Sequence, residues 1–170
     1  MVVASGSEGA GRDLLGIYLN DHLAGATAGV ELARRMARSH AGLAGGALRG
    51  LAADIAGDRS ALRDIMAGLG VPVRAYQVCA GWAGEKAGRL KLSGRLRSRS
   101  LLSDLEELEM LGLGVEGKAA GWRTLRVLAD SEPRLDAARL EGLLSRARDQ
   151  ADLLEELRVR AAGEILAASR

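Results

Sequence analysis

Apolar residues recur at steps of three and four along most of the chain, which is the spacing of one face of an α-helix. The clearest run is apolar at every position of this face except one, Asp58. Its members are Leu48, Leu51, Ile55, Asp58, Leu62, Ile65 and Leu69. Gly70 and Pro72 follow, and a glycine with a proline shortly after it commonly ends a helix. The pattern therefore predicts a long helix that buries one face.

The same spacing predicts further long helices over residues 12–40, 103–130 and 133–166. The glycine-rich stretch 42–46 is the expected turn between the first two helices. Residues 1–11 are rich in glycine and serine, and we expect them to be a disordered lead-in. The remainder, residues 12–167, is expected to form a single domain, because 170 residues is the size of one domain.

The composition supports an all-α fold. The chain contains no Phe, so its core must be made of Leu, Ala, Val, Ile and Met, which suit helix packing better than sheet packing. Only two prolines are present, which leaves long stretches without a helix breaker. We predict a four-helix bundle in which a long, partly helical crossover over residues 73–102 joins two helix pairs.

Charge and cysteine content indicate the compartment. The net charge of +2 is nearly balanced, and the excess of Arg over Lys, with much Ala and Gly, is typical of a GC-rich bacterial genome. Cys79 is the only cysteine, so an intrachain disulfide is excluded and a reducing compartment is favoured. The first residues do not combine a basic region with an apolar one, and no apolar run is long enough to span a membrane. We therefore expect a cytoplasmic protein that does not bind membranes.

Three segments share a recognisable rhythm of small, apolar and charged residues. They read LNDHLAGATAGVEL in the first predicted helix, LAADIAGDRSALRDIMAGLGV in the second, and LEMLGLGVEGKAAGWRTLRVLAD in the third. Together with the layout of two helix pairs and a long connection, they resemble the ferritin-like superfamily, and within it small bacterial branches without an assigned function. The resemblance covers most of the chain and implies a ferritin-like four-helix bundle.

A di-iron site of this superfamily needs carboxylates from four helices and a Glu-x-x-His pair on two of them. The chain contains no Glu-x-x-His pair. The first helix offers His22 where a Glu is expected, the second offers Asp54 and Asp58 without a His, and the fourth offers Gln150, a poor metal ligand. The resemblance therefore implies a degenerate metal site, and we expect no cofactor. Iron or manganese is the alternative, held by His22, Asp58, Glu109 and Glu116.

Polar side chains fall within the apolar stripe of every predicted long helix. They are His22, Asp58, Glu109 with Glu116, and Gln150. A buried polar group costs several kcal/mol without a partner, so these residues are expected to satisfy one another or to bind a ligand. Arg158 lies on the stripe of the fourth helix and is the expected partner of Glu109 if no metal is bound.

The positions of these residues along the helices restrict their contacts. Counted from the turn near Glu132, Glu116 and Gln150 lie at about the same level of the bundle, at about 1.5 Å per residue. His22 and Asp58 are offset by roughly 9 Å on the same count, so His22 is expected to be a hydrogen-bonded core or boundary residue. For Asp58 we expect a pair with Arg59, Arg63 or an arginine of a neighbouring helix.

The segment from residue 86 to residue 99 is strongly basic. Its cations are Lys86, Arg89, Lys91, Arg95, Arg97 and Arg99. Such a run can bind phosphate-rich partners, but it lacks the interleaved aromatic residues that stack on bases. A solvated linker is therefore the preferred interpretation, and nucleic-acid binding is the less favoured one.

Glycines four residues apart lie within two predicted helices, Gly25 with Gly29 and Gly117 with Gly121. Glycine costs about 1 kcal/mol relative to Ala in a helix, so these positions are expected to allow a close approach of helices. The approach is expected either inside the bundle or across a homodimer interface.

Three function classes remain open from the sequence. The preferred one is a non-enzymatic ferritin-like bundle with a structural or partner-binding role, because the metal-ligand set is incomplete. The second is a metal-carboxylate protein that binds iron or manganese and has oxidase activity. The third is an anion or nucleic-acid binder that uses the basic segment. No catalytic residue is predicted.

Overall fold

The computed structural model describes residues 5–39, 42–74 and 101–168, and within these ranges it contains helices and no strand. The helices are α1 (Ser5–Ser39), α2 (Gly42–Gly68), α4 (Leu101–Leu128) and α5 (Ala137–Ala168). The prediction of an all-α fold is confirmed. The predicted crossover helix, Cys79 and the basic segment lie outside the described residues. Among the described helices, none is both long and apolar enough to cross a membrane.

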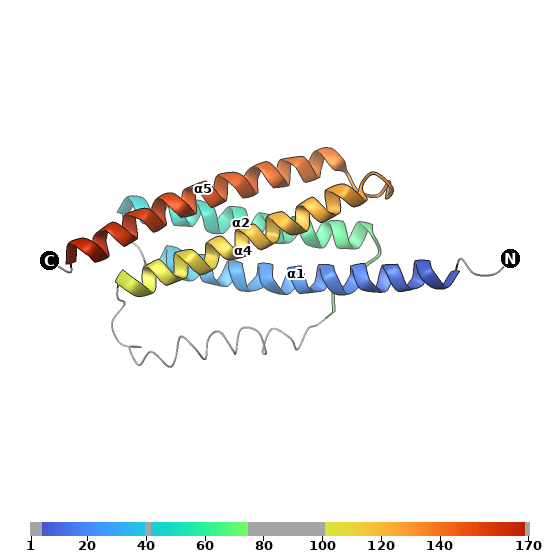
Figure 1. Cartoon of the computed structure of the whole chain (residues 1–170), viewed down its shortest axis with the longest axis horizontal. Helices are drawn as coiled ribbons and strands as arrows, with labels where there is room; N and C mark the ends of the chain where they lie inside the picture. Colours follow the sequence, from blue (N-terminus) through green and yellow to red (C-terminus); the bar gives the residue numbers. More distant parts are fainter. Residues whose placement is uncertain (1–4, 40–41, 75–100, 169–170) are drawn as a thin grey trace.

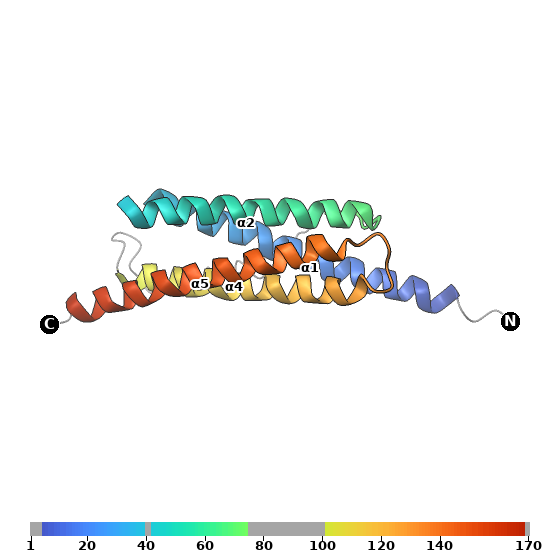
Figure 2. The same ribbon diagram turned by 90° about the horizontal axis from the view of Figure 1, so that it is seen from above.

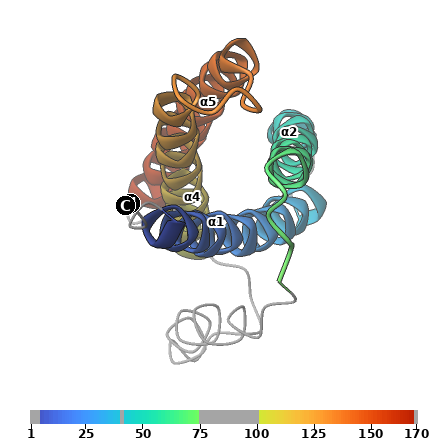
Figure 3. The same cartoon turned by 90° about the vertical axis from the view of Figure 1, so that its right-hand side faces the viewer.

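The helices form two antiparallel hairpins, α1 with α2 and α4 with α5 (Figure 1). The hairpins pack together mainly through α1 and α4, whereas α2 and α5 have little backbone contact (Figure 3). Figure 2 shows that α1 runs obliquely, from beside α2 at its C-terminal end towards α4 at its N-terminal end. The end of α2 and the start of α4 lie at opposite ends of the bundle (Figure 1).

The apolar seam predicted for α2 is buried along its full length. Its apolar members divide between two core clusters, one with Leu62, Ile65 and Leu69 and the other with Leu48, Leu51 and Ile55. Asp58 lies between the two sets in the sequence. The division recurs on α4, where Val115 belongs to one cluster and Ala119 to the other, and on α5. The core therefore consists of two apolar halves with a layer of polar side chains between them.

The end of α2 is the helix stop that Gly70 and Pro72 predict. Gly70 has a φ of 70°, a conformation that glycine adopts without a Cβ clash. The N–H of Gly70 donates to the carbonyl of Ala67, and the N–H of Val71 donates to the carbonyl of Met66. This pair of bonds is the Schellman motif. Buried Asn20 of α1 then fixes the segment beyond, since its amide donates to the carbonyl of Pro72 at 3.2 Å.

Three predicted boundaries differ from the observed ones. The first helix begins at Ser5 rather than at Arg12, because glycine lowers helix propensity without blocking a helix and no proline intervenes. The expected glycine-rich turn at 42–46 is the first part of α2 for the same reason. The last helix begins at Ala137 rather than near Pro133, because Asp136 is the N-cap: its carboxylate accepts the backbone N–H of Arg139 at 3.1 Å.

Candidate functional site

The polar layer of the core is built around Asp58 of α2, whose side chain is only 1% exposed. One carboxylate oxygen, Oδ1, accepts from Arg146 of α5, with Nε at 2.7 Å and Nη2 at 2.6 Å. The other, Oδ2, accepts from Nζ of Lys118 on α4 at 2.5 Å and from Nε2 of Gln150 on α5 at 3.0 Å. Lys118 also donates to Oε1 of Gln150. We call these four residues the Asp58 cluster.

The Asp58 cluster carries more positive than negative charge. Two cations, Lys118 and Arg146, share one carboxylate, which gives a formal charge of +1 when Lys118 is protonated. The Lys118 side chain is 13% exposed, whereas that of Arg146 is 41% exposed and reaches the edge of the bundle. Burial lowers the pKa of Lys118, and the nearby Asp58 carboxylate opposes this effect. The ammonium is thus the more confined of the two cations.

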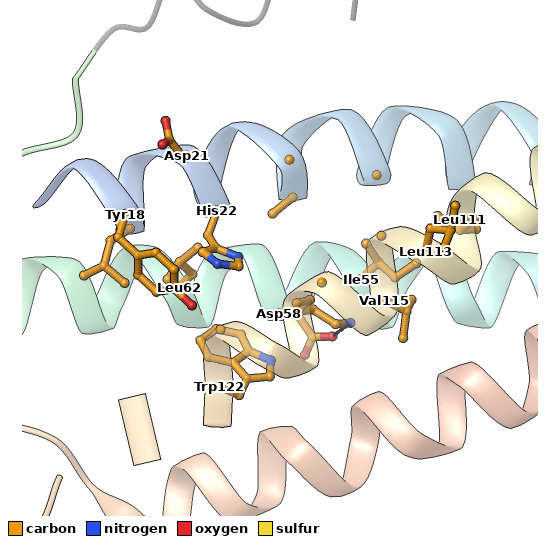
Figure 4. Close-up of a pocket in the computed structure, with 18 of the residues that line it drawn as sticks. Tyr18, Asp21, His22, Ile55, Asp58, Leu62, Leu111, Leu113, Val115 and Trp122 are labelled. Carbon is orange, nitrogen blue, oxygen red and sulfur yellow. Dashed lines mark hydrogen bonds and ion pairs between the residues drawn. The ribbon is translucent and has the colours of Figure 1, made fainter. Parts of the chain in front are cut away.

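A groove of about 460 Å³ lies beside the Asp58 cluster. Its walls are formed by α1 and α4, whose rim residues are exposed, and its floor by buried Ile55, Asp58 and Leu62 of α2 (Figure 4). Lys118 lines the groove at this floor. The remaining lining is largely apolar. The groove is therefore a largely apolar space whose charged lining residues are Asp58 and Lys118, which are paired, and exposed Asp21.

Glycines keep the groove open. At Gly25, Gly114 and Gly117 an added Cβ would meet no neighbouring atom within 4 Å, so the space beside them is empty. A Cβ added at Gly121 would lie 3.0 Å from the imidazole ring of His22, because this ring covers the glycine. The predicted close approach of helices thus occurs at Gly121 but not at Gly25 or Gly117.

His22 and Trp122 lie at the end of the groove where Gly121 is covered (Figure 4). The His22 ring packs edge-on against Tyr18, with the ring centroids 4.5 Å apart. Burial lowers the pKa of His22, with Asp21 opposing the shift, so the ring is neutral at pH 7. Trp122 is 2% exposed, and its indole Nε1 has no hydrogen-bond acceptor among the described residues.

Asp58 and Gln150 are in the polar interior as predicted, whereas Asp54, Glu109 and Glu116 are exposed. The face predicted for the third long helix is therefore wrong. Apolar residues occur all around α4, so that Leu113 and Val127 remain exposed, and the spacing alone does not single out the buried face. The residues on that face are Leu108, Leu111, Val115, Ala119, Gly121, Trp122 and Leu125.

Some pairings differ from those expected. Gln150 bonds to Asp58 and Lys118 instead of lying against Glu116. Arg158 forms the expected ion pair with Glu109, at 3.9 Å, but its hydrogen bonds go to Glu155, at 2.6 Å for the Nε contact. Of the partners considered for Asp58, the arginine of a neighbouring helix is the one observed, and it is Arg146.

Four residues of the interior and the site are not predicted from the sequence: Lys118, Arg146, Asn20 and Trp122. A signal for Lys118 was present, because it follows Val115 by three residues and precedes Trp122 by four, which places all three on one helix face. Arg146 lies next to Ala147 of the apolar stripe and reaches inward only through its long side chain. Nothing in the spacing distinguishes buried Asn20 from exposed Asp21 beside it.

The residues considered as metal ligands do not gather. His22 lines the groove without bonding to Asp58, and the two glutamates are on the exposed side of α4. Within residues 5–39, 42–74 and 101–168, no three His, Cys, Asp or Glu side chains are placed to hold one metal ion. Asp58 itself is already neutralised by two cations.

No protein-family model, curated protein or solved structure matches this chain. The resemblance to the ferritin-like superfamily therefore rests on the layout and the quoted segments alone.

Replacing Asp58 by Leu should destabilise the protein by about 3–5 kcal/mol, because Lys118 and Gln150 would lose a buried acceptor. The double variant Asp58→Leu with Lys118→Met should recover most of this loss, since it removes both confined charges. Asp64→Leu is the matched control, because Asp64 lies on α2 like Asp58 but forms an exposed pair, with Arg139 of α5. This variant should change stability by less than about 1 kcal/mol. Urea unfolding measures all three. Equal stability of the wild type and Asp58→Leu would contradict the proposed importance of the Asp58 cluster.

His22 should make stability depend on pH. Burial holds the pKa of His22 below that of a free imidazole in the folded protein, so the unfolded chain takes up the proton first as the pH falls. The wild type should therefore lose stability relative to His22→Gln between about pH 7.5 and 5, by at most about 1.4 kcal/mol per pH unit. Urea unfolding of both proteins across this range gives the difference. If the free energy of unfolding changed equally with pH in both proteins, burial would not lower the pKa of His22.

Proposed function

We propose that the protein is a non-enzymatic ferritin-like bundle, with a degenerate metal site, that binds a small apolar molecule in the groove between α1 and α4. The observation that carries this proposal is the open groove of about 460 Å³. Ligand sites in proteins have volumes of about 300–1,000 Å³ and are mostly apolar with a few polar groups. The groove has both properties.

Three glycines of the groove leave room for a ligand, although exposed helical glycines outside the groove, such as Gly142, also have open space beside them. Each glycine in a helix interior lowers stability by about 1 kcal/mol relative to Ala, a cost that close helix packing can offset. At Gly25, Gly114 and Gly117 there is no such packing to provide the compensation. A ligand that fills the space beside them would provide it. This is the partner-binding form of the function expected from the sequence.

The Asp58 cluster supports a binding role over an enzymatic one. Asp58 is held by three side chains and Lys118 by two, so both are fixed within the core. Among the described residues, the His22 ring has no carboxylate or hydroxyl hydrogen-bonded to it that would make it a catalytic base. The groove can therefore select a ligand by shape and charge without a reaction step.

Iron or manganese binding is less well supported. A divalent cation at Asp58 would have to displace or face the two cations already there, and those cations would repel it. Nucleic-acid binding through residues 86–99 and a cytoplasmic location stay as predicted from the sequence. A homodimer through the glycine-lined faces is the competing use of the groove.

A neutral apolar dye such as Nile red should bind the wild type with a rise in fluorescence. Gly117→Leu should weaken binding at least about tenfold, because the new side chain projects into the empty space of the groove. Gly142→Leu is the matched control, since Gly142 is an exposed helical glycine of α5 outside the groove and also has no neighbour within 4 Å. Equal binding by all three proteins would place the dye elsewhere and would contradict the proposed site.

A further inference from the structure

Lys118 has a hydrogen-bond donor to spare at the floor of the groove. A lysine ammonium has three N–H donors. Among the described residues its acceptors are Oδ2 of Asp58 and Oε1 of Gln150, which leaves one donor. Lys118 also lines the groove, so a ligand there lies next to its ammonium.

A second donor near this position lacks an acceptor. Trp122 lines the same groove and is 2% exposed, yet its Nε1 has no acceptor among the described residues. Buried indole N–H groups usually find a partner, because an unpaired one loses its hydrogen bond to water without replacement. Figure 4 shows the indole nitrogen on the side of the ring that is turned towards Asp58. Both spare donors therefore belong to one end of the same space.

The charge of the site favours an anion. The Asp58 cluster has two cations for one carboxylate, and the surrounding core is apolar. Two further carboxylates are near, Asp21 in the lining of the groove and Asp54 close enough to act on Lys118, but both are exposed to solvent, which screens them. An uncompensated positive charge in such surroundings is costly, and a negative group beside Lys118 would balance it. Arg146 already has a route to solvent, so the uncompensated charge is that of Lys118.

The rest of the groove favours an aliphatic chain. From Met110 to Lys118 its lining runs about 12 Å along α4, at about 1.5 Å per residue. The wall on this side includes Gly114 and Gly117 of α4 and faces Gly25 and Gly29 of α1. Gly25, Gly114 and Gly117 leave room for a chain, whereas Ile55 lies beside Gly29 and His22 occupies the space at Gly121.

We propose that the ligand of this groove is an aliphatic monocarboxylate, whose carboxylate accepts hydrogen bonds from Lys118 and Trp122 and whose alkyl chain lies between the glycines of α1 and α4. This inference rests on the proposed function, because it names the chemical class of the molecule that the groove binds. The apolar walls supply affinity for the chain, and Lys118 supplies the preference for an anionic head group.

The test compares three probes with the same alkyl chain by titration calorimetry at pH 7.5: decanoate, 1-decanol and decyltrimethylammonium. Wild-type protein should bind one decanoate per chain, about tenfold more tightly than decanol, and should bind the cationic probe most weakly. Lys118→Met should abolish the preference for decanoate and weaken decanol binding much less, because a neutral hydroxyl gains less than a carboxylate from an ammonium. This variant keeps Asp58 paired with Arg146, so the carboxylate is not left alone.

Trp122→Phe is a second, independent variant, because it removes Nε1 and retains most of the ring. It should weaken decanoate binding severalfold and decanol binding by less, because a charged acceptor forms the stronger hydrogen bond. Equal affinity of the wild type for decanoate and decanol would overturn the carboxylate inference while leaving the apolar groove as the proposed function. Failure of the wild type to bind either probe would overturn both. Decanoate binding that survives Gly117→Leu would also overturn the inference, since the carboxylate would then bind outside the groove.

Discussion

A single buried carboxylate determines how the two halves of this bundle meet. Asp58 is almost fully enclosed, and an ionised carboxylate in an apolar core is tolerated only when charged and polar groups surround it. Its partners come from α4 and α5, the two helices of the other hairpin. A shift of one hairpin along the other by a single turn would separate Asp58 from all of them. The carboxylate therefore fixes the register of the hairpins.

The same requirement explains the layered core and the groove. Lys118 and Gln150 occupy the level of Asp58, so the apolar residues divide into one cluster on each side of this level. Because α2 and α5 have little backbone contact, the bonds from Asp58 to Arg146 and Gln150 are a main link across that side of the bundle. On the side of α1 and α4, glycines leave a space next to Lys118. One polar layer thus joins the hairpins and supplies the paired charged residues of the groove.

The sequence predicted the long helices and the buried seam of α2, because the seam has a single polar interruption and thus one unambiguous face. Counting residues from a turn placed Gln150 at about the level of Glu116, and its observed partner on α4 is Lys118, two residues further along. The spacing predicted the wrong face of α4, where apolar residues such as Leu113 and Val127 occur outside the core. As a result Glu109 and Glu116 were expected inside, and Lys118 was overlooked. The contacts of Arg146 and the space beside Gly117 depend on how the helices pack, which spacing within one helix does not specify.

The most direct test of this account is NMR spectroscopy of the lysine ammonium groups. Protons on exposed ammonium groups exchange too fast with water to be seen at neutral pH, whereas a buried, hydrogen-bonded ammonium exchanges slowly. The account predicts one protected ammonium signal at pH 7 that disappears in Lys118→Met, with a hydrogen-bond coupling from its nitrogen to the carboxylate carbon of Asp58. Absence of a protected signal, or a signal unaffected by Asp58→Asn, would show that Asp58 and Lys118 do not form the contact on which the register of the hairpins depends.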